Sequence, residues 1–305
     1  MAKPTSEIKN KVKRFEVFRK RTVEKRKEAD ERRLERKREL QELGKPLPQP
    51  KTIESKRVRT EDTVDPEDAE IKGDDEEDEF APFWNNEKEP KILLTTRPRP
   101  SRHLFRFVGD LMAMVPFVFY HPRKSRELKE MASWAVENEF THMIVLGEKN
   151  KVCTRLTLSL LPDGPTAQFK VSSIELMKEI PNHGAPTDHL PEIVLNNFST
   201  RLGHRLGRFF GTLFPKRPEF EGRTVVTFHN QRDFIFVRHH RYEFTPEFRR
   251  ANLQEIGPRF TLKLRWLSRG GDSVSDRQHS EFEFTREKGE KKFKEEGKDG
   301  REFFL

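Results

Sequence analysis

The sequence predicts a mixed α/β protein whose folded domain consists of two similar halves, preceded by a long charged helix and an acidic linker. Three observations predict this fold class. Charge is segregated along the chain, capped helix patterns alternate with short strand patterns between residues 90 and 270, and one strand–helix pattern recurs. Only 33% of the residues are hydrophobic and 36% are charged, so part of the chain is too polar to form a core.

The charged residues form three blocks behind a formal net charge of +9. Residues 1–60 contain 21 basic and 10 acidic side chains, residues 61–90 contain 2 and 14, and residues 91–305 contain 37 and 27. Blocks of this kind are typical of interaction segments or disordered segments. We therefore expect a basic helical arm (1–43), an acidic linker (44–89), a folded domain (90–270) and a charged C-terminal tail (271–305).

The arm is predicted to be one long helix, because residues 8–43 contain neither proline nor glycine. Glu16 with Lys20 and Glu28 with Arg32 support it at i,i+4 spacing. Its apolar residues are too sparse to form a core. A solvated helix and an arm that binds nucleic acid or a protein partner are both consistent with this pattern.

The acidic segment after the arm is predicted to be a flexible linker, because it combines several prolines with the acidic run Asp74–Glu79. Phe80, Phe83 and Trp84 are conspicuous beside that run. They either anchor the segment on a partner or on the folded domain, or belong to a disordered stretch.

The first half of the domain, about 90–180, contains strand and helix patterns in alternation. Ser101 is a helix N-cap candidate, and Pro116 ends that helix. Leucines alternate with polar residues in 154–161, which indicates a half-buried strand. We expect strands at 92–95, 117–120, 142–146, 154–161 and 167–176, and helices at 101–115 and 125–139.

The second half, about 190–270, begins with a similar unit. A strand at 193–195 precedes a helix that Ser199 or Thr200 caps and that Pro215 ends. The matching strand–helix spacing of 92–116 and 193–215 suggests a duplicated α/β half-domain. Paired strands follow at 224–228 and 234–244. In the second of these, we expect Arg238 to share a face with Phe234 and Phe236.

The helix at 201–214 has three stripes at helical spacing. One is apolar and one carries three glycines, which suggests a close approach that we assign to helix–sheet packing rather than to phosphate contact. The third is a basic edge flanked by His204. Together with later arginines it forms a candidate secondary basic surface: Arg201, Arg205, Arg208, Arg232, Arg238 and Arg241.

The segment 257–266 shows the most regular alternation in the chain. Phe260, Leu262, Leu264 and Trp266 are expected to face the core. Arg259, Thr261, Lys263 and Arg265 are then expected to form the opposite face. Cations at this density neutralise phosphates with a salt-dependent affinity that depends little on sequence. The alternative is an ordinary solvated strand face.

No catalytic constellation accompanies these patterns. The phosphate-binding glycine loops are absent, and His239 and His240 point in opposite directions on a strand, so they cannot share a metal ion. Arg232 and Asp233 after His229 lack the other elements of a kinase. We therefore expect a protein that is not an enzyme and has neither cofactor nor metal.

The sequence also indicates the compartment. Cys153 is the only cysteine, which excludes an intrachain disulfide and fits a reducing compartment. The N-terminus lacks an apolar signal region, and the most apolar run, 111–120, is broken by a proline. We expect a cytosolic or nuclear protein without a membrane span.

Several segments in one order resemble the Brix domain family. The resemblance covers about 90–270 and is carried by Lys91–Thr96, Leu161–Ala167, Leu195–Phe198, Thr200–His204, Thr227–Asp233 and Gly257–Leu264. It implies two α/β halves related to anticodon-binding domains. It also implies a nucleolar factor that binds precursor ribosomal RNA during assembly of the large ribosomal subunit, together with other assembly factors that dock on the domain.

The RNA-binding motif of the family falls on one segment of this chain. By resemblance, its candidate residues are Phe248, Arg249, Arg250, Ala251, Asn252, Leu253, Gln254, Glu255, Ile256, Gly257, Pro258, Arg259, Phe260, Thr261, Leu262, Lys263, Leu264 and Arg265. A scaffold that mainly binds protein within pre-ribosomal particles is the alternative, because part of the basic and aromatic surface would then face a protein partner.

Overall fold

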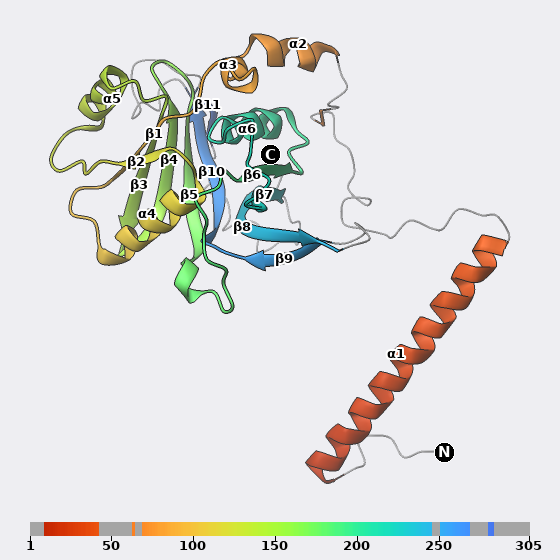
Figure 1. Cartoon of the computed structure of the whole chain (residues 1–305). Helices are drawn as coiled ribbons and strands as arrows, with labels where there is room; N and C mark the ends of the chain where they lie inside the picture. Colours follow the sequence, from red (N-terminus) through yellow and green to blue (C-terminus); the bar gives the residue numbers. More distant parts are fainter. Residues whose placement is uncertain (1–8, 43–62, 65–68, 246–250, 269–279, 284–305) are drawn as a thin grey trace, which may run out of the picture. The chain divides into compact units, whose positions relative to one another are not determined.

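A computed structural model describes residues 9–42, 63–64, 69–245, 251–268 and 280–283 (Figure 1). The chain divides into two compact units, Met1–Arg59 and Thr60–Leu305. The described part of the first unit is helix α1 (Lys11–Glu42), which confirms the predicted long helix. Asn10 begins it by accepting a hydrogen bond from the Val12 amide at 3.0 Å. None of its described side chains is buried, and five of its apolar side chains are exposed: Val12, Phe15, Phe18, Val23 and Leu34.

The second unit contains one large mixed sheet. Its strands run in the order β2-β1-β3-β4-β5-β10-β8-β7-β6, with β9 beside β8 and β11 beside β10. The strands are β1 (Ile92–Thr96), β2 (Val118–Tyr120), β3 (His142–Lys149), β4 (Val152–Leu160), β5 (Thr166–Glu175), β6 (Glu192–Asn196), β7 (Thr224–Gln231), β8 (Phe234–Phe244), β9 (Ala251–Glu255), β10 (Arg259–Ser268) and β11 (Ser280–Glu283).

The sheet repeats one topology twice, which confirms the predicted pair of similar halves. In the first half, β1 leads through helix α4 (Arg102–Met114) to β3, which pairs with β1 in parallel and continues into the antiparallel strands β4 and β5. In the second half, β6 leads through helix α6 (Arg201–Gly211) to the parallel strand β7, followed by antiparallel β8 and β10. Antiparallel pairing of β5 with β10 joins the two halves.

The two repeated helices begin at the caps that the sequence predicts. The Ser101 hydroxyl accepts a hydrogen bond from the Leu104 amide at 3.3 Å. The Thr200 hydroxyl accepts one from the Gly203 amide at 3.0 Å. Such caps satisfy amide groups that have no partner inside the helix.

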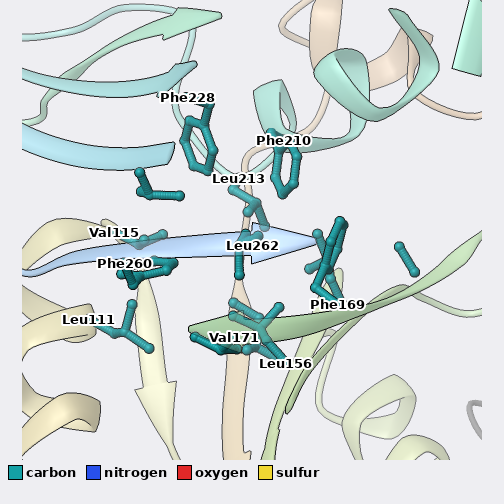
Figure 2. Packing of buried hydrophobic residues seen from close by; sticks show 14 of the residues in the cluster. Leu111, Val115, Leu156, Phe169, Val171, Phe210, Leu213, Phe228, Phe260 and Leu262 are labelled. Carbon is teal, nitrogen blue, oxygen red and sulfur yellow. The ribbon is translucent and has the colours of Figure 1, made fainter. Parts of the chain in front are cut away.

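Helices α4 and α6 pack on the same face of the sheet around β10 (Figure 2). Phe107 of α4 meets Phe260 edge-on at 5.4 Å between ring centroids, and Phe210 of α6 stacks on Phe228 at 4.7 Å. Helix α5 (Leu128–Glu137) covers the opposite face of β1 and β3, where Met131 is fully buried. Within the part of the chain that the structure describes, no helix is long and apolar enough to cross a membrane.

The segment predicted to be a flexible linker is ordered in its second part, so the prediction is wrong there. It forms helices α2 (Ala69–Glu77) and α3 (Ala81–Trp84). Phe80 is 1% exposed and stacks on Phe209 of α6 at 5.3 Å. Burial of aromatic rings in the core offsets the entropy cost of ordering this polar segment. Residues 44–62 of the predicted linker lie outside the described residues.

Trp84 also packs on α6, near the C-terminal end of the helix. Its indole nitrogen donates a hydrogen bond to the Arg208 carbonyl at 3.2 Å. A Cβ atom at Gly211 would lie 2.3 Å from the Trp84 ring, so this glycine is required for the close approach. Gly207 similarly receives the side chain of Phe198. At these two positions the glycine stripe is approached by aromatic side chains, so its assignment to close packing against the backbone of the sheet is wrong there.

Two buried histidines are held in the neutral form. His142 on β3 is fully buried and lies 2.8 Å from the Thr212 hydroxyl just after α6, so it connects the two halves. Burial lowers its pKa to about 3. His239 on β8 lies 2.9 Å from the Gly257 carbonyl, and burial lowers its pKa to about 4.

We expect the free energy of unfolding to decrease as the pH falls below about 6.5, because these histidines take up protons in the unfolded chain before they do so in the folded chain. Each contributes a slope of at most about 1.4 kcal/mol per pH unit. Urea denaturation at neutral pH and about two units lower measures this loss. His142→Gln removes one titrating group, so an unchanged pH dependence in that variant would contradict the assignment.

Gly211→Ala is expected to destabilise the protein by about 1–3 kcal/mol, because its methyl group would overlap the Trp84 ring. Gly109 on α4 is the matched control, since nothing lies within 4 Å of a Cβ atom there. Gly109→Ala should stabilise the helix by up to about 1 kcal/mol. Thermal or urea denaturation of both variants makes the comparison, and equal stabilities would exclude the close packing of Trp84.

Candidate nucleic-acid interface

Strand β10 carries the last part, 259–265, of the segment in which the sequence places RNA binding. Phe260, Leu262 and Leu264 face the core as predicted. The pairing with β5 then shifts, since Leu264 lies opposite Phe169 whereas Trp266 lies opposite Gln168. This bulge gives Leu267, not Trp266, the next core position. Trp266 is buried as predicted, with 3% of its surface exposed, but it lies on the sheet face opposite α4 and α6.

Arg259 at the start of β10 is engaged in ion pairs. Its guanidinium donates to the Glu175 carboxylate and lies 3.3 Å from a carboxylate oxygen of Glu255. These contacts, chiefly the hydrogen bond to Glu175, raise the pKa of Arg259. The residue therefore links β5, β9 and β10, and its charge is compensated within the protein.

Three other cations form a row across the sheet. Arg155 on β4 lies directly opposite Lys170 on β5, and Lys170 lies directly opposite Lys263 on β10. Register partners in a sheet point to the same face, so all three side chains project from the side opposite α4 and α6. Arg155 and Lys170 are exposed, and Lys263 is half-buried. Like charges in this position repel one another, which favours the binding of an anion between them.

Aromatic side chains continue this row onto β8. The ammonium group of Lys263 lies 4.9 Å from the centroid of the Phe234 ring. Phe236 lies opposite Thr261 on one side and opposite His229 on the other. Arg238 follows on the same face, as predicted, with its guanidinium 6.0 Å from the Phe236 ring. We call the whole set the basic–aromatic face: Arg155, Lys170, Lys263, Phe234, Phe236, Arg238 and His229.

The repeated topology explains why no helix covers this face in the second half. In the first half, β2 and α5 lie between α4 and β3, and α5 packs on this side of the sheet. In the second half, the described connection 212–223 between α6 and β7 contains no helix. Among the described residues, no helix takes the position equivalent to α5, and β8 presents Phe234 with 38% of its surface exposed.

The basic edge of α6 is not an open surface, contrary to the prediction. Acidic residues of the segment that carries α2 bind it. Arg208 donates two hydrogen bonds to the Asp78 carboxylate, at 2.6 and 2.8 Å, and Arg205 pairs with Glu79 at 2.6 Å. His204 lies 2.9 Å from Asp75. The two segments have opposite charge and lie about 130 residues apart in the sequence. Their contact cannot be predicted from either segment alone.

The remaining members of the predicted secondary surface are dispersed. Arg201 and Arg232 are exposed at the start of α6 and in the turn between β7 and β8. Arg241 donates a hydrogen bond to the Ala185 carbonyl at 3.0 Å. Arg238 belongs to the basic–aromatic face, where burial lowers the pKa of its guanidinium. The structure therefore does not bring the six arginines together.

The predicted RNA-binding segment is similarly divided. Residues 248–250 lie outside the described residues. Ala251, Asn252, Leu253 and Gln254 are exposed on β9, and Glu255, Arg259, Lys263 and Arg265 are half-buried. The other members are buried: Ile256, Gly257, Pro258, Phe260, Thr261, Leu262 and Leu264. Arg155 and Lys170 were missed, because only strand register places them beside Lys263.

The structure offers little support for catalysis. Among the described residues, no group of three or more histidine, cysteine or carboxylate side chains is arranged to hold a metal ion. A cavity of about 40 Å³ between α4, α6 and the sheet is lined only by apolar side chains such as Leu111, Phe210 and Phe260. Cys153 is buried, which raises the pKa of its thiol to about 12.

Comparison with known proteins decides the family. A model of the Brix domain matches residues 98–266. The chain belongs to the Brix family. The resemblance indicated by the sequence segments is thus confirmed.

The chain is similar to known proteins over nearly its whole length. It is 47% identical over 283 residues to Ribosome production factor 1 of Rattus norvegicus, which covers 92% of this chain and 81% of the relative. It is 41% identical over 280 residues to Ribosome production factor 1 of Saccharomyces cerevisiae, with 89% and 93% covered. These similarities support a role in ribosome biogenesis and association with pre-ribosomal particles.

A solved structure is also similar. The crystal structure of a probable ribosomal biogenesis protein from Aeropyrum pernix K1 is 20% identical, with a TM-score of 0.42. The match covers 57% of this chain and 96% of that protein.

We expect Arg208→Ala to lower the free energy of unfolding by about 1–3 kcal/mol, because the partly buried carboxylates of Asp75 and Asp78 would lose a charged partner. Arg217→Ala is the control, since Arg217 is exposed and its removal should change stability by less than about 0.5 kcal/mol. Urea denaturation at low salt measures both. Equal effects would show that the contact between the acidic segment and α6 contributes no stability.

Proposed function

We propose that the protein is a non-enzymatic ribosome biogenesis factor that binds precursor ribosomal RNA during assembly of the large ribosomal subunit. The observation that carries this proposal is the row of Arg155, Lys170 and Lys263 across three strands. These cations lie on one sheet face beside Phe234 and Phe236.

Phosphate binding would neutralise the charges of the cation row. Like charges on adjacent strands repel one another, and an anion bound between them reduces this repulsion. A polyanion such as RNA neutralises them and releases counterions, so its affinity falls as salt rises. Lys263 connects this face with the RNA-binding segment 248–265 that the family resemblance implies.

The proposed site of action is the nucleus, and within it the nucleolus, where precursor ribosomal RNA is processed. Basic clusters at 25–27 and 36–38 on α1 are candidate nuclear address signals, a pattern of low specificity. Other large-subunit assembly factors are the proposed protein partners.

Replacing Arg155, Lys170 and Lys263 together by alanine should weaken binding of ribosomal RNA fragments and flatten its salt dependence. The slope of log K against log salt should decrease by about 0.7 for each lost contact to single-stranded RNA, or about 2 in total. Fluorescence anisotropy of the full chain at several salt concentrations measures this slope.

The matched control removes the same charge on or beside the helices. Arg102 and Arg106 are exposed on α4 and Arg217 is exposed after α6, and both helices pack on the side of the sheet opposite the basic–aromatic face. Their replacement by alanine should leave the salt slope nearly unchanged. If both triple variants lose affinity equally, binding reflects net charge alone, and the assignment to this face is wrong.

A scaffold that mainly binds protein is the second candidate function. It is favoured by exposed apolar side chains on the edge strand β2 and on β9, where Phe119 is 52% and Leu253 is 62% exposed. This candidate predicts weak RNA binding by the full chain and co-purification with assembly factors that survives nuclease treatment. Crosslinking to RNA in cells, with the adducts mapped to residues, separates the two.

A further inference from the structure

We infer that the basic–aromatic face binds single-stranded RNA, with successive bases stacked on Phe234 and Phe236 and with the flanking phosphates on the cation row. This inference rests on the proposed function, because it takes RNA as the ligand. It goes further by specifying the form of the RNA and the groups that contact the bases.

The two rings are placed as a fixed platform. Phe234 and Phe236 are two residues apart on β8, so they share a face and are separated by about 7 Å along the strand. Strand β8 is paired on both sides, with β7 and with β10, which holds these ring positions in place. Phe234 is exposed and Phe236 is half-buried, so the rings stand at the surface of an ordered sheet.

Each ring has a cation beside it. Lys263 approaches Phe234 and Arg238 approaches Phe236, at 4.9 and 6.0 Å from the ring centroids. A cation–π contact at an exposed site is weaker than the stacking of a base on an aromatic ring. A base can therefore replace the cation over the ring, and the displaced cation then contacts the phosphate next to that base.

Neutral polar groups surround the platform. Gln231 on β7 lies opposite Phe234, and His229 lies opposite Phe236. On the other side, Thr261 lies opposite Phe236 and Ser172 lies opposite Thr261. Of these, the half-buried side chains of Gln231, His229 and Ser172 offer hydrogen-bond donors and acceptors to the edges of stacked bases.

These features favour a single strand over a duplex. In an RNA duplex, the bases are stacked on one another and cannot reach the rings, so only the cations would bind. In a single strand, the bases are accessible, and paired aromatic residues on a sheet are a recognised way of binding them. An acidic peptide would use the cations but would leave the rings without a function.

The test compares three labelled probes of about 10 nucleotides, binding to the full chain. They are an oligouridine single strand, a duplex of the same length, and a ribose–phosphate strand without bases. Phe234→Ala and Phe236→Ala should each weaken binding of the single strand by between about 5-fold and about 100-fold. Binding of the duplex and of the strand without bases should change by less than about 2-fold.

Two controls accompany these variants. Phe234→Tyr and Phe236→Tyr keep a ring and should retain affinity for the single strand. Phe220→Ala removes a ring that is 65% exposed in the connection before β7, and it should have no effect on any probe. Circular dichroism and urea denaturation of each variant show whether a loss of binding reflects unfolding.

The outcomes separate this inference from the proposed function. If the chain binds RNA but the alanine variants bind all three probes like the wild type, stacking is excluded and RNA binding by the cations stands. If the chain binds neither these probes nor ribosomal RNA, both proposals fail. If the variants keep their RNA affinity but lose assembly factors after nuclease treatment, the face binds protein and the inference is wrong.

Discussion

Antiparallel pairing between β5 and β10 holds the two halves of the sheet together, and much of the remaining structure depends on it. On one side of β10, Phe260, Leu262 and Leu264 receive side chains from both α4 and α6, so a single strand supports two helices. On the other side, the same pairing sets Lys263 opposite Lys170. Core packing and the charge of the surface are therefore fixed by one register, and a shift of one residue would exchange them.

The sheet tolerates repulsion within the cation row because apolar burial on the opposite side stabilises it by a larger free energy. Facing like charges cost a sheet on the order of 0.2–1 kcal/mol per pair, whereas burial of one large apolar side chain contributes about 1.5–3 kcal/mol. The core side of β10 supplies several such residues. The sheet can thus hold cations close together without a bound ligand. An anion that binds there interacts with several cations at once.

Periodicity in the sequence predicted the alternation of core and surface residues on β8 and most of β10, as well as the two caps at Ser101 and Thr200. It did not reveal that Trp266 is buried on the side opposite α4 and α6, because a bulge is a property of two paired strands and leaves no signal in one of them. It also missed Arg155 and Lys170, which lie beside Lys263 only through register. The acidic segment was misjudged for a similar reason, since its order comes from Arg208 and Phe209, far along the chain.

The contact between the acidic segment and α6 affects how the isolated domain behaves. The region that matches the Brix family begins at residue 98, whereas Asp78, Glu79 and Phe80 lie before it. A fragment that starts between Trp84 and β1 would keep the whole sheet but expose Arg205, Arg208 and the apolar surface under Phe80. Such a fragment would attract nucleic acid through a surface that the complete chain neutralises itself. Any RNA affinity of the trimmed domain would therefore include a component created by the trimming.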